Sequence, residues 1–183
     1  MNASDGLRLS AWKFPDKKAA VFFDQQMTYK EMDKRVNQLS NGMLEKGIKK
    51  GDKVAYMMYN CLEALEIIQA LMRIGAILVP INFRLDAERT EFIINHCDAT
   101  YLFVGDAILA DIIEPMMPNL KNIPKENYIV VGEGGDGYVK YEDIFSEDDA
   151  NPEADIKPKD TAYIAYTSGT TGMPKGVVTS SRA

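Results

Sequence analysis

Hydrophobic residues between positions 28 and 47 recur at intervals of three or four, the spacing of one face of a helix. This apolar face consists of Met32, Val36, Leu39 and Met43. Thr28 is placed to begin the helix, because its hydroxyl can accept from the amide of Glu31 while the Glu31 carboxylate reaches back. Gly47 is placed to end the helix, since glycine readily adopts the left-handed conformation that closes many helices.

Three more helices are predicted farther along the chain. Their ranges are 60–75, 86–95 and about 107–117. Asn60 and Asp86 are suitable N-caps for the first two, whereas Gly75 ends the first and Pro118 stops the third. We expect the buried stripe of the first helix to consist of Leu65, Ile68, Leu71 and Met72.

Continuous apolar runs between these helices are typical of strands that are buried on both faces. The runs are 54–58, 76–81, 101–104, 128–131 and 161–166. Residues 19–23 and 27–28 predict a small β-hairpin near the start, with its turn at 24–26. Strands that alternate with helices indicate the α/β class, with a largely parallel sheet flanked by helices and joined by right-handed crossovers.

Two segments read as surface structure. Residues 132–137 are rich in glycine, but no helix of suitable length follows them, so we interpret them as a surface loop and not a nucleotide loop. Residues 147–159 are acidic and contain proline, which predicts a linker or an extended surface segment.

Composition narrows the possible functions. The chain has 183 residues, 46% of them hydrophobic and 26% charged, which predicts one folded unit or one part of a larger domain. Its formal net charge is -6, and there is no basic stripe, so nucleic acid is not an expected partner. Cys61 and Cys97 lack the spacing of metal ligands and read as small buried residues of a reducing compartment. Without a signal peptide or a bilayer-length apolar run, the expected location is the cytoplasm.

Residues 166–177, called the 166–177 loop below, concentrate hydroxyls and glycines around a single lysine. Glycines let backbone amides approach phosphate oxygens, hydroxyls donate further hydrogen bonds, and Lys175 adds a positive charge. The loop does not fit the Walker A pattern, which would require glycine in place of Pro174 and serine or threonine in place of Gly176. A simple Ser/Thr/Gly turn is the alternative interpretation.

The sequence of the loop, Tyr-Thr-Ser-Gly-Thr-Thr-Gly-x-Pro-Lys-Gly-Val, resembles the phosphate-loop signature of the acyl-adenylate-forming (AMP-binding) superfamily without a mismatch. This superfamily contains acyl-CoA synthetases, the adenylation domains of peptide synthetases and beetle luciferases. Weaker landmarks upstream extend the resemblance to about Trp12. They are Thr28-Tyr29-x-Glu31, Gly47-Ile48-x-x-Gly51-Asp52-x-Val54, Asn60, and Gly75-Ala76-x-x-Val79-Pro80-x-Asn82-x-Arg84-Leu85.

The resemblance implies that ATP and a carboxylic acid form an acyl-adenylate and pyrophosphate, after which the acyl group passes to coenzyme A. It implies that the β- and γ-phosphates of ATP contact Thr167, Ser168, Gly169, Thr170, Thr171, Gly172 and Lys175. Mg²⁺ would bridge phosphate oxygens with Thr167 nearby, and Lys175 would be the catalytic residue in this part of the protein. The alternative for Lys175 is a solvated loop charge.

By the same resemblance, residues 1–183 form the amino-terminal portion of an AMP-binding domain. The rest of that domain and a small carboxy-terminal domain with the main catalytic lysine would lie beyond Ala183, so we expect the chain alone to be inactive. Ser181 stands where the family often has histidine. His96, near the end of a predicted helix, is expected to be structural. An incomplete layer would expose apolar surface and favour self-association.

Among activities, an acyl-CoA ligase for a fatty or aromatic acid is the leading hypothesis. Pro80-Ile81-Asn82-Phe83-Arg84-Leu85 resembles the ligase version of this landmark more than the Pro-Leu-Asp-Pro form of amino-acid-adenylating domains. The alternatives are an amino-acid-adenylating domain and a non-catalytic nucleotide-binding module. The expected partners are therefore a small carboxylic acid, ATP and coenzyme A.

Overall fold

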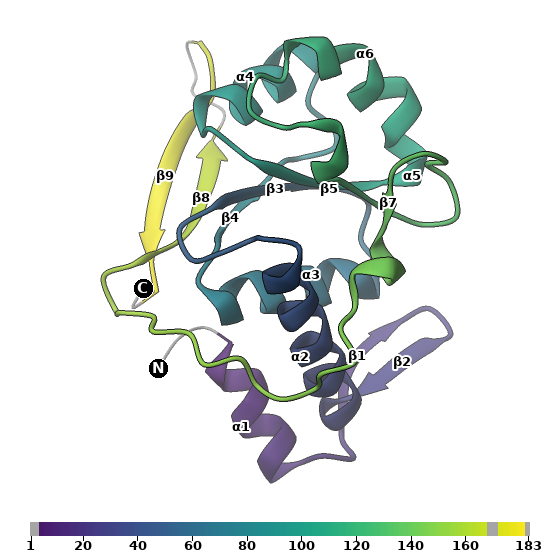
Figure 1. The fold of residues 1–183 in the computed structure, drawn as a ribbon, viewed down its shortest axis with the longest axis vertical. Helices are drawn as coiled ribbons and strands as arrows, with labels where there is room; N and C mark the ends of the chain where they lie inside the picture. The colour runs from purple at the N-terminus through teal and green to yellow at the C-terminus, as the bar shows by residue number, and fades with distance from the viewer. Residues whose placement is uncertain (1–3, 168–171, 182–183) are drawn as a thin grey trace.

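A seven-stranded, mostly parallel sheet forms the centre of the molecule (Figure 1). The computed structural model describes residues 4–167 and 172–181. In spatial order the strands are β7 (Val139–Lys140), β6 (Tyr128–Val131), β5 (Tyr101–Gly105), β3 (Lys53–Met57), β4 (Ile77–Pro80), β8 (Thr161–Thr167) and β9 (Lys175–Ser180). Every neighbouring pair is parallel except β8 and β9, which are antiparallel. The α/β class and the parallel sheet are confirmed.

Helices cover both faces of this sheet (Figure 1). One face carries α2 (Tyr29–Glu45) and α3 (Leu62–Ile74), and the other carries α4 (Ala87–His96) and the helical segment that follows β5. Successive strand residues therefore enter different cores. Val54 and Phe103 pack in the cluster with α2 and α3, whereas Ala55 and Leu102 pack in the cluster with α4. Burial on both faces explains the continuous apolar runs in the sequence.

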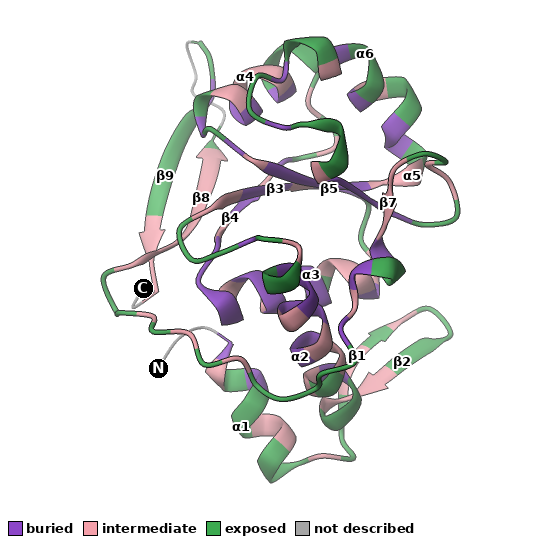
Figure 2. Cartoon of the chain, viewed as in Figure 1, coloured by how far each residue is buried: buried purple, intermediate pink, exposed green. Residues whose placement is uncertain are grey.

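The helix after the hairpin forms as its sequence predicts. Thr28 is the N-cap of α2, its hydroxyl accepts from the Glu31 amide, and the Glu31 carboxylate accepts from the Thr28 amide at 2.8 Å. All four residues of the predicted apolar face are buried, as Figure 2 shows for the inner side of α2. Gly47 has a φ of +94°, so its left-handed conformation is confirmed.

Helix α3 corrects two expectations. Its N-cap is Cys61 rather than Asn60, and no side chain makes a capping hydrogen bond there. The predicted stripe is also wrong, because Leu65 is 43% exposed and Leu71 is its one buried member. The buried apolar residues that pack in the cluster with α2 and the sheet are Ile67, Ala70, Leu71 and Ile74, whereas Leu62 is buried beside the pocket. Helix α3 is apolar on more than one side, and periodicity does not separate its core face from the face that lines a cavity.

The segment predicted as a helix over 107–117 is helical but irregular. It comprises α5 (Asp106–Ile108), a π-helix (Leu109–Ile113), α6 (Glu114–Met116) and a 3-10 turn (Met117–Asn119). Pro115 lacks an amide hydrogen and cannot continue a regular hydrogen-bond ladder, which is consistent with the wider turn before it. Two further 3-10 turns, Lys125–Asn127 and Tyr141–Ile144, flank β6 and β7.

Near the start, α1 (Asp5–Lys13) was not predicted, and its buried apolar residue is Leu7. The hairpin is confirmed as β1 (Lys18–Phe22) and β2 (Gln25–Thr28), but its turn lies at Phe23 and Asp24, with Phe23 at a φ of +50°. Residues 147–159 contain no helix or strand and run along the surface, where Asn41 donates to the carbonyls of Asp148 and Ala150.

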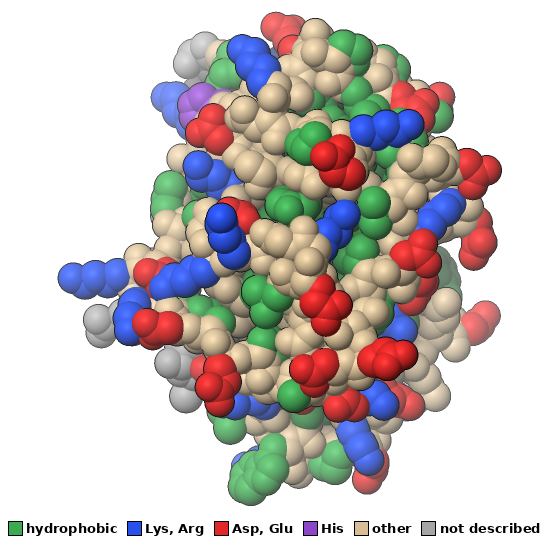
Figure 3. Space-filling model, in the orientation of Figure 1, with side chains coloured by type: hydrophobic (Ala, Val, Ile, Leu, Met, Phe, Trp, Pro, Cys, Tyr) green, Lys and Arg blue, Asp and Glu red, His purple; other side chains and the backbone are tan. Residues whose placement is uncertain are grey.

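Acidic and basic side chains are interspersed over the face drawn in Figure 3, without a basic stripe. Within the described residues, no helix has both the length and the apolar character needed to cross a bilayer.

Candidate nucleotide site

The 166–177 loop connects the last two strands of the sheet. In the β8–β9 ladder, Thr167 pairs with Lys175 and Tyr166 pairs with Gly176. The predicted loop residues Thr167 and Lys175 are therefore opposite each other on neighbouring strands. Gly172 is exposed beside them, and Pro174 is buried. Ser168, Gly169, Thr170 and Thr171 lie outside the described residues. The loop follows the carboxyl end of β8, the edge at which ligands bind in open α/β sheets.

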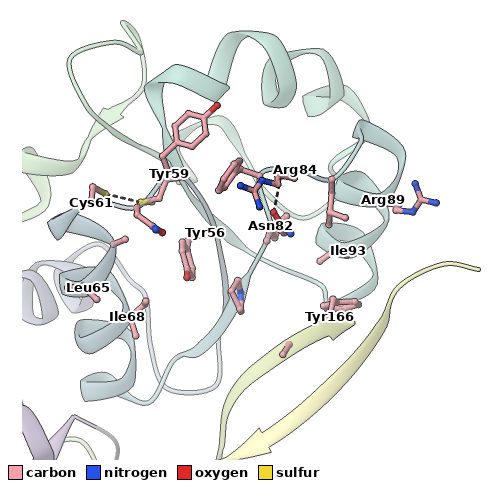
Figure 4. A pocket seen from close by; sticks show the side chains of 18 of the residues that line it. Tyr56, Tyr59, Cys61, Leu65, Ile68, Asn82, Arg84, Arg89, Ile93 and Tyr166 are labelled. Atoms are coloured by element: carbon pink, nitrogen blue, oxygen red, sulfur yellow. Dashed lines mark hydrogen bonds between the residues drawn. The ribbon is translucent and has the colours of Figure 1, made fainter. Parts of the chain in front are cut away.

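A pocket of about 770 Å³ opens at this same edge (Figure 4). Its walls come from the ends of β3, β4 and β8, the first turns of α3, the side of α4 and strand β1. Its apolar lining includes Tyr56, Tyr59, Leu65, Ile68, Phe83 and Ile93. Tyr166, Gly172 and Pro174 close the pocket on the side of the 166–177 loop. The loop and an apolar pocket therefore share one edge of the sheet.

Polar groups enter this pocket mainly from the segment after β4. The Asn82 side-chain oxygen accepts from the Arg84 amide at 3.0 Å, and the Asp86 carboxylate accepts from the Arg89 amide at 2.8 Å, so Asp86 is the N-cap of α4 as predicted. Arg89 also forms an ion pair with Asp86. Arg84 lies over the ring of Phe83, with its guanidinium carbon 5.3 Å from the ring centroid.

Burial determines the ionisation of several groups around the pocket. Desolvation raises the pKa of Tyr166 to about 12 and that of the Cys61 thiol to about 11, and it also raises the pKa of Tyr56. These groups are therefore neutral near pH 7. A neutral thiol is a poor nucleophile, so the structural role expected for Cys61 fits its surroundings. Cys61 is half-buried and Cys97 is buried.

His96 contacts the start of the 166–177 loop from α4. A hydrogen bond of 2.7 Å joins its Nδ1 atom to the hydroxyl of Tyr166. Phe92, one turn earlier on α4, stacks on the imidazole with a centroid distance of 5.0 Å. Sequence reasoning missed this contact, because 70 residues separate the two partners and no local pattern connects them.

Clusters of metal-ligating side chains were sought among residues 4–167 and 172–181. There, no three His, Cys, Asp or Glu side chains are grouped to hold an ion. Mg²⁺ prefers oxygen ligands and often binds through substrate phosphates and one or two protein groups. The exposed Thr167 hydroxyl at the loop fits the role of one such oxygen ligand.

Comparison with known proteins settles the family. The profile of the AMP-binding enzyme family matches residues 7–183, nearly the whole chain. The chain belongs to this family. The resemblance carried by the 166–177 loop and its upstream landmarks is confirmed.

Named relatives of this AMP-binding chain are CoA ligases. It is 36% identical over 178 residues to a crotonobetaine/carnitine–CoA ligase of Proteus mirabilis, covering 89% of this chain and 33% of the relative. It is 32% identical over 174 residues to a medium/long-chain-fatty-acid–CoA/3-oxocholest-4-en-26-oate–CoA ligase of Mycobacterium marinum, covering 90% and 31%. The crystal structure of the anthranilate CoA ligase AuaEII with anthranoyl-AMP superposes with a TM-score of 0.92 at 28% identity, covering 100% of this chain and 35% of that one. The chain thus spans about a third of the length of these relatives.

Proposed function

We propose that the protein activates a carboxylic acid with ATP, forming an acyl-adenylate and pyrophosphate, and then transfers the acyl group to the thiol of coenzyme A with release of AMP. The observation that carries the proposal is the pairing of Thr167 with Lys175 beside an apolar pocket at the carboxyl edge of the sheet. Within this activity, residues 1–183 contribute the amino-terminal portion of an AMP-binding domain.

In the proposed reaction, a carboxylate oxygen attacks the α-phosphorus of ATP, and the bond to the bridging oxygen of pyrophosphate breaks. Negative charge grows on the departing pyrophosphate, so groups that neutralise it lower the barrier. Lys175 supplies a positive charge, and the hydroxyls of Thr167, Ser168, Thr170 and Thr171 supply hydrogen bonds. The amides of Gly169 and Gly172 complete the set of donors. Mg²⁺ bound with ATP would add positive charge at the phosphate oxygens, with Thr167 as its protein ligand.

The acid is proposed to be fatty or aromatic. Aliphatic and aromatic side chains line most of the pocket, and burial of an apolar acyl group there would be favourable. The named relatives support both classes, since one is a medium/long-chain-fatty-acid–CoA ligase and another is an anthranilate CoA ligase. An amino-acid-adenylating domain remains the second hypothesis from the sequence, and no feature of the pocket favours it.

The test is ATP–pyrophosphate exchange with a panel of fatty, aromatic and amino acids, measured on a longer protein that carries this chain and on residues 1–183 alone. We expect exchange stimulated by fatty or aromatic acids in the longer protein and none in residues 1–183. Exchange stimulated by amino acids would replace the proposed substrate class. Failure of every acid to stimulate exchange in the longer protein would overturn the proposed activity in favour of a binding module.

A further inference from the structure

We propose that His96 is a positioning residue for the loop end of the β8–β9 hairpin, acting through the hydroxyl of Tyr166. Its contribution to ATP binding rests on the proposed function, whereas its contribution to the order of the hairpin does not. Tyr166 directly precedes Thr167, and its partner Gly176 directly follows Lys175. A group that holds Tyr166 therefore acts on both sides of the Thr167–Lys175 pair.

The orientation of the imidazole is fixed from two directions. Its Nδ1 atom lies 2.7 Å from the Tyr166 hydroxyl, and the two rings meet edge to face at 86° with centroids 5.8 Å apart. Phe92 stacks on the imidazole at an interplanar angle of 28°. Because Phe92 and His96 are four residues apart on α4, the helix itself sets their spacing. The imidazole is thus held by its own helix while it holds the tyrosine.

The ring of Tyr166 lies close to the backbone of β9. A Cβ atom built at Gly176 would lie 3.1 Å from Cζ of Tyr166 and 3.1 Å from Cγ2 of Ile164. Glycine at this position therefore lets the tyrosine ring occupy the space beside β9 that a side chain would otherwise fill. The contacts form a continuous path from α4, through His96 and Tyr166, to the backbone beside Lys175.

Other connections between the loop end of the hairpin and the rest of the sheet are few. Strand β8 pairs with β4 at the register position Leu78–Tyr163, four residues before Thr167. Beyond that point β8 is paired with β9, which has no second neighbour among the described strands. Among the residues that the structure describes, the bond from Tyr166 to His96 is the one side-chain hydrogen bond made by residues 161–167. Its loss should therefore free the loop end of the hairpin specifically.

Hydrogen–deuterium exchange of residues 1–183 without ligand tests the effect on order. Tyr166→Phe keeps the ring but removes the hydroxyl, and His96→Ala removes the imidazole. We expect both to accelerate exchange of the amides at 166–167 and 175–177, with no change in β3 or β5. His96→Asn should restore much of the protection, because an asparagine amide lies nearly where Nδ1 lies. Glu88→Gln, an exposed change on the same helix, is the matched control.

A spectroscopic signature adds a direct check on the bond. His96 is the only histidine of the chain, so the imidazole NMR signals belong to this residue, and their couplings to the ring protons distinguish Nδ1 from Nε2. Tyr166→Phe should shift the Nδ1 signal more than the Nε2 signal. Exchange rates and imidazole signals that match those of the unaltered chain in Tyr166→Phe would overturn the proposal, whatever the chain does with ATP.

Calorimetric titration with MgATP of a longer protein that carries this chain, with the same substitutions, tests the consequence for binding. Loss of one hydrogen bond should weaken affinity by about threefold to tenfold in His96→Ala, with partial recovery in His96→Asn and none of this effect in Glu88→Gln. Equal affinities in His96→Ala and Glu88→Gln would overturn the link to binding. If the unaltered longer protein bound no MgATP, the proposed function would be contradicted, and the hydrogen–deuterium exchange experiment would still decide the role of His96.

Discussion

The centre and the edge of the sheet are held in place in different ways. Strand β3 lies between β4 and β5 and pairs with each of them at four register positions, and both its faces are covered by helices. The β8–β9 hairpin instead meets the sheet at one register position of β4. Its outer strand exposes Val177 and Val178, at 51% and 63% of their surface. Figure 2 shows this contrast between buried central strands and the more exposed hairpin.

Because the two regions are packed differently, we expect the central strands to determine stability and the β8–β9 hairpin to determine binding. Residues of the central strands contribute apolar burial, which dominates the free energy of folding. The residues proposed to contact phosphate lie on the hairpin, where few core contacts would be lost on substitution. Variants in the two regions should therefore affect different measurements.

The largest expected effect comes from the centre. Phe103 is fully buried on β5, so Phe103→Ala should lower the free energy of unfolding by about 3–5 kcal/mol. Val178→Lys on the exposed edge should change it by less than about 0.5 kcal/mol, because lysine is tolerated on edge strands. Urea unfolding monitored by circular dichroism measures both. If the two variants lost similar free energy of unfolding, the edge strand would contribute as much stability as the central strand, and the contrast between them would be wrong.

A smaller loss of stability is expected from a change at the start of α2, the helix that covers one face of the central strands. Thr28→Ala removes the N-cap hydroxyl and should lower the free energy of unfolding by about 1 kcal/mol at neutral pH. Affinity for MgATP should stay unchanged, because the cap does not contact the 166–177 loop. A loss of affinity without a loss of stability would contradict the proposed separation.

The same cap predicts a dependence on pH. Hydrogen bonds from the Thr28 amide and hydroxyl hold the pKa of Glu31 below its ordinary value of 4.5. Stabilisation by the charged carboxylate is therefore present above the unfolded pKa and is lost as the pH falls through the lower, folded value. The difference in stability between the unaltered chain and Thr28→Ala should shrink under acid conditions. A constant difference across this range would exclude a role for the ionised carboxylate.

Much of the fold could be predicted because some patterns have one structural meaning. Thr28, Glu31 and Gly47 bound α2 through local hydrogen bonds and backbone conformation, which sequence encodes directly. Helix α1 was missed because only Leu7 of its residues joins a core, so it has no apolar stripe. The predicted buried face of α3 was wrong because Leu65 is exposed and lines the pocket, while Ile68 both lines the pocket and packs against the core.

The candidate site was predictable to a more limited extent. The 166–177 loop carries a long ordered signature, so its place at the end of a strand could be predicted without tertiary information. The apolar pocket and the His96–Tyr166 bond depend on segments far apart in sequence that meet at the carboxyl edge of the sheet. Such long-range contacts follow from topology and side-chain packing, which local sequence patterns do not specify.

We propose that the loop end of the β8–β9 hairpin binds the phosphates of ATP, and calorimetric titration of a longer protein that carries this chain with MgATP tests this most directly. Lys175→Ala should weaken affinity about tenfold or more, because a charge-assisted hydrogen bond to phosphate is lost. Lys159→Ala, which removes an exposed lysine from the segment before β8, should leave affinity unchanged. Equal weakening by the two substitutions, or no effect of Lys175→Ala, would contradict the claim.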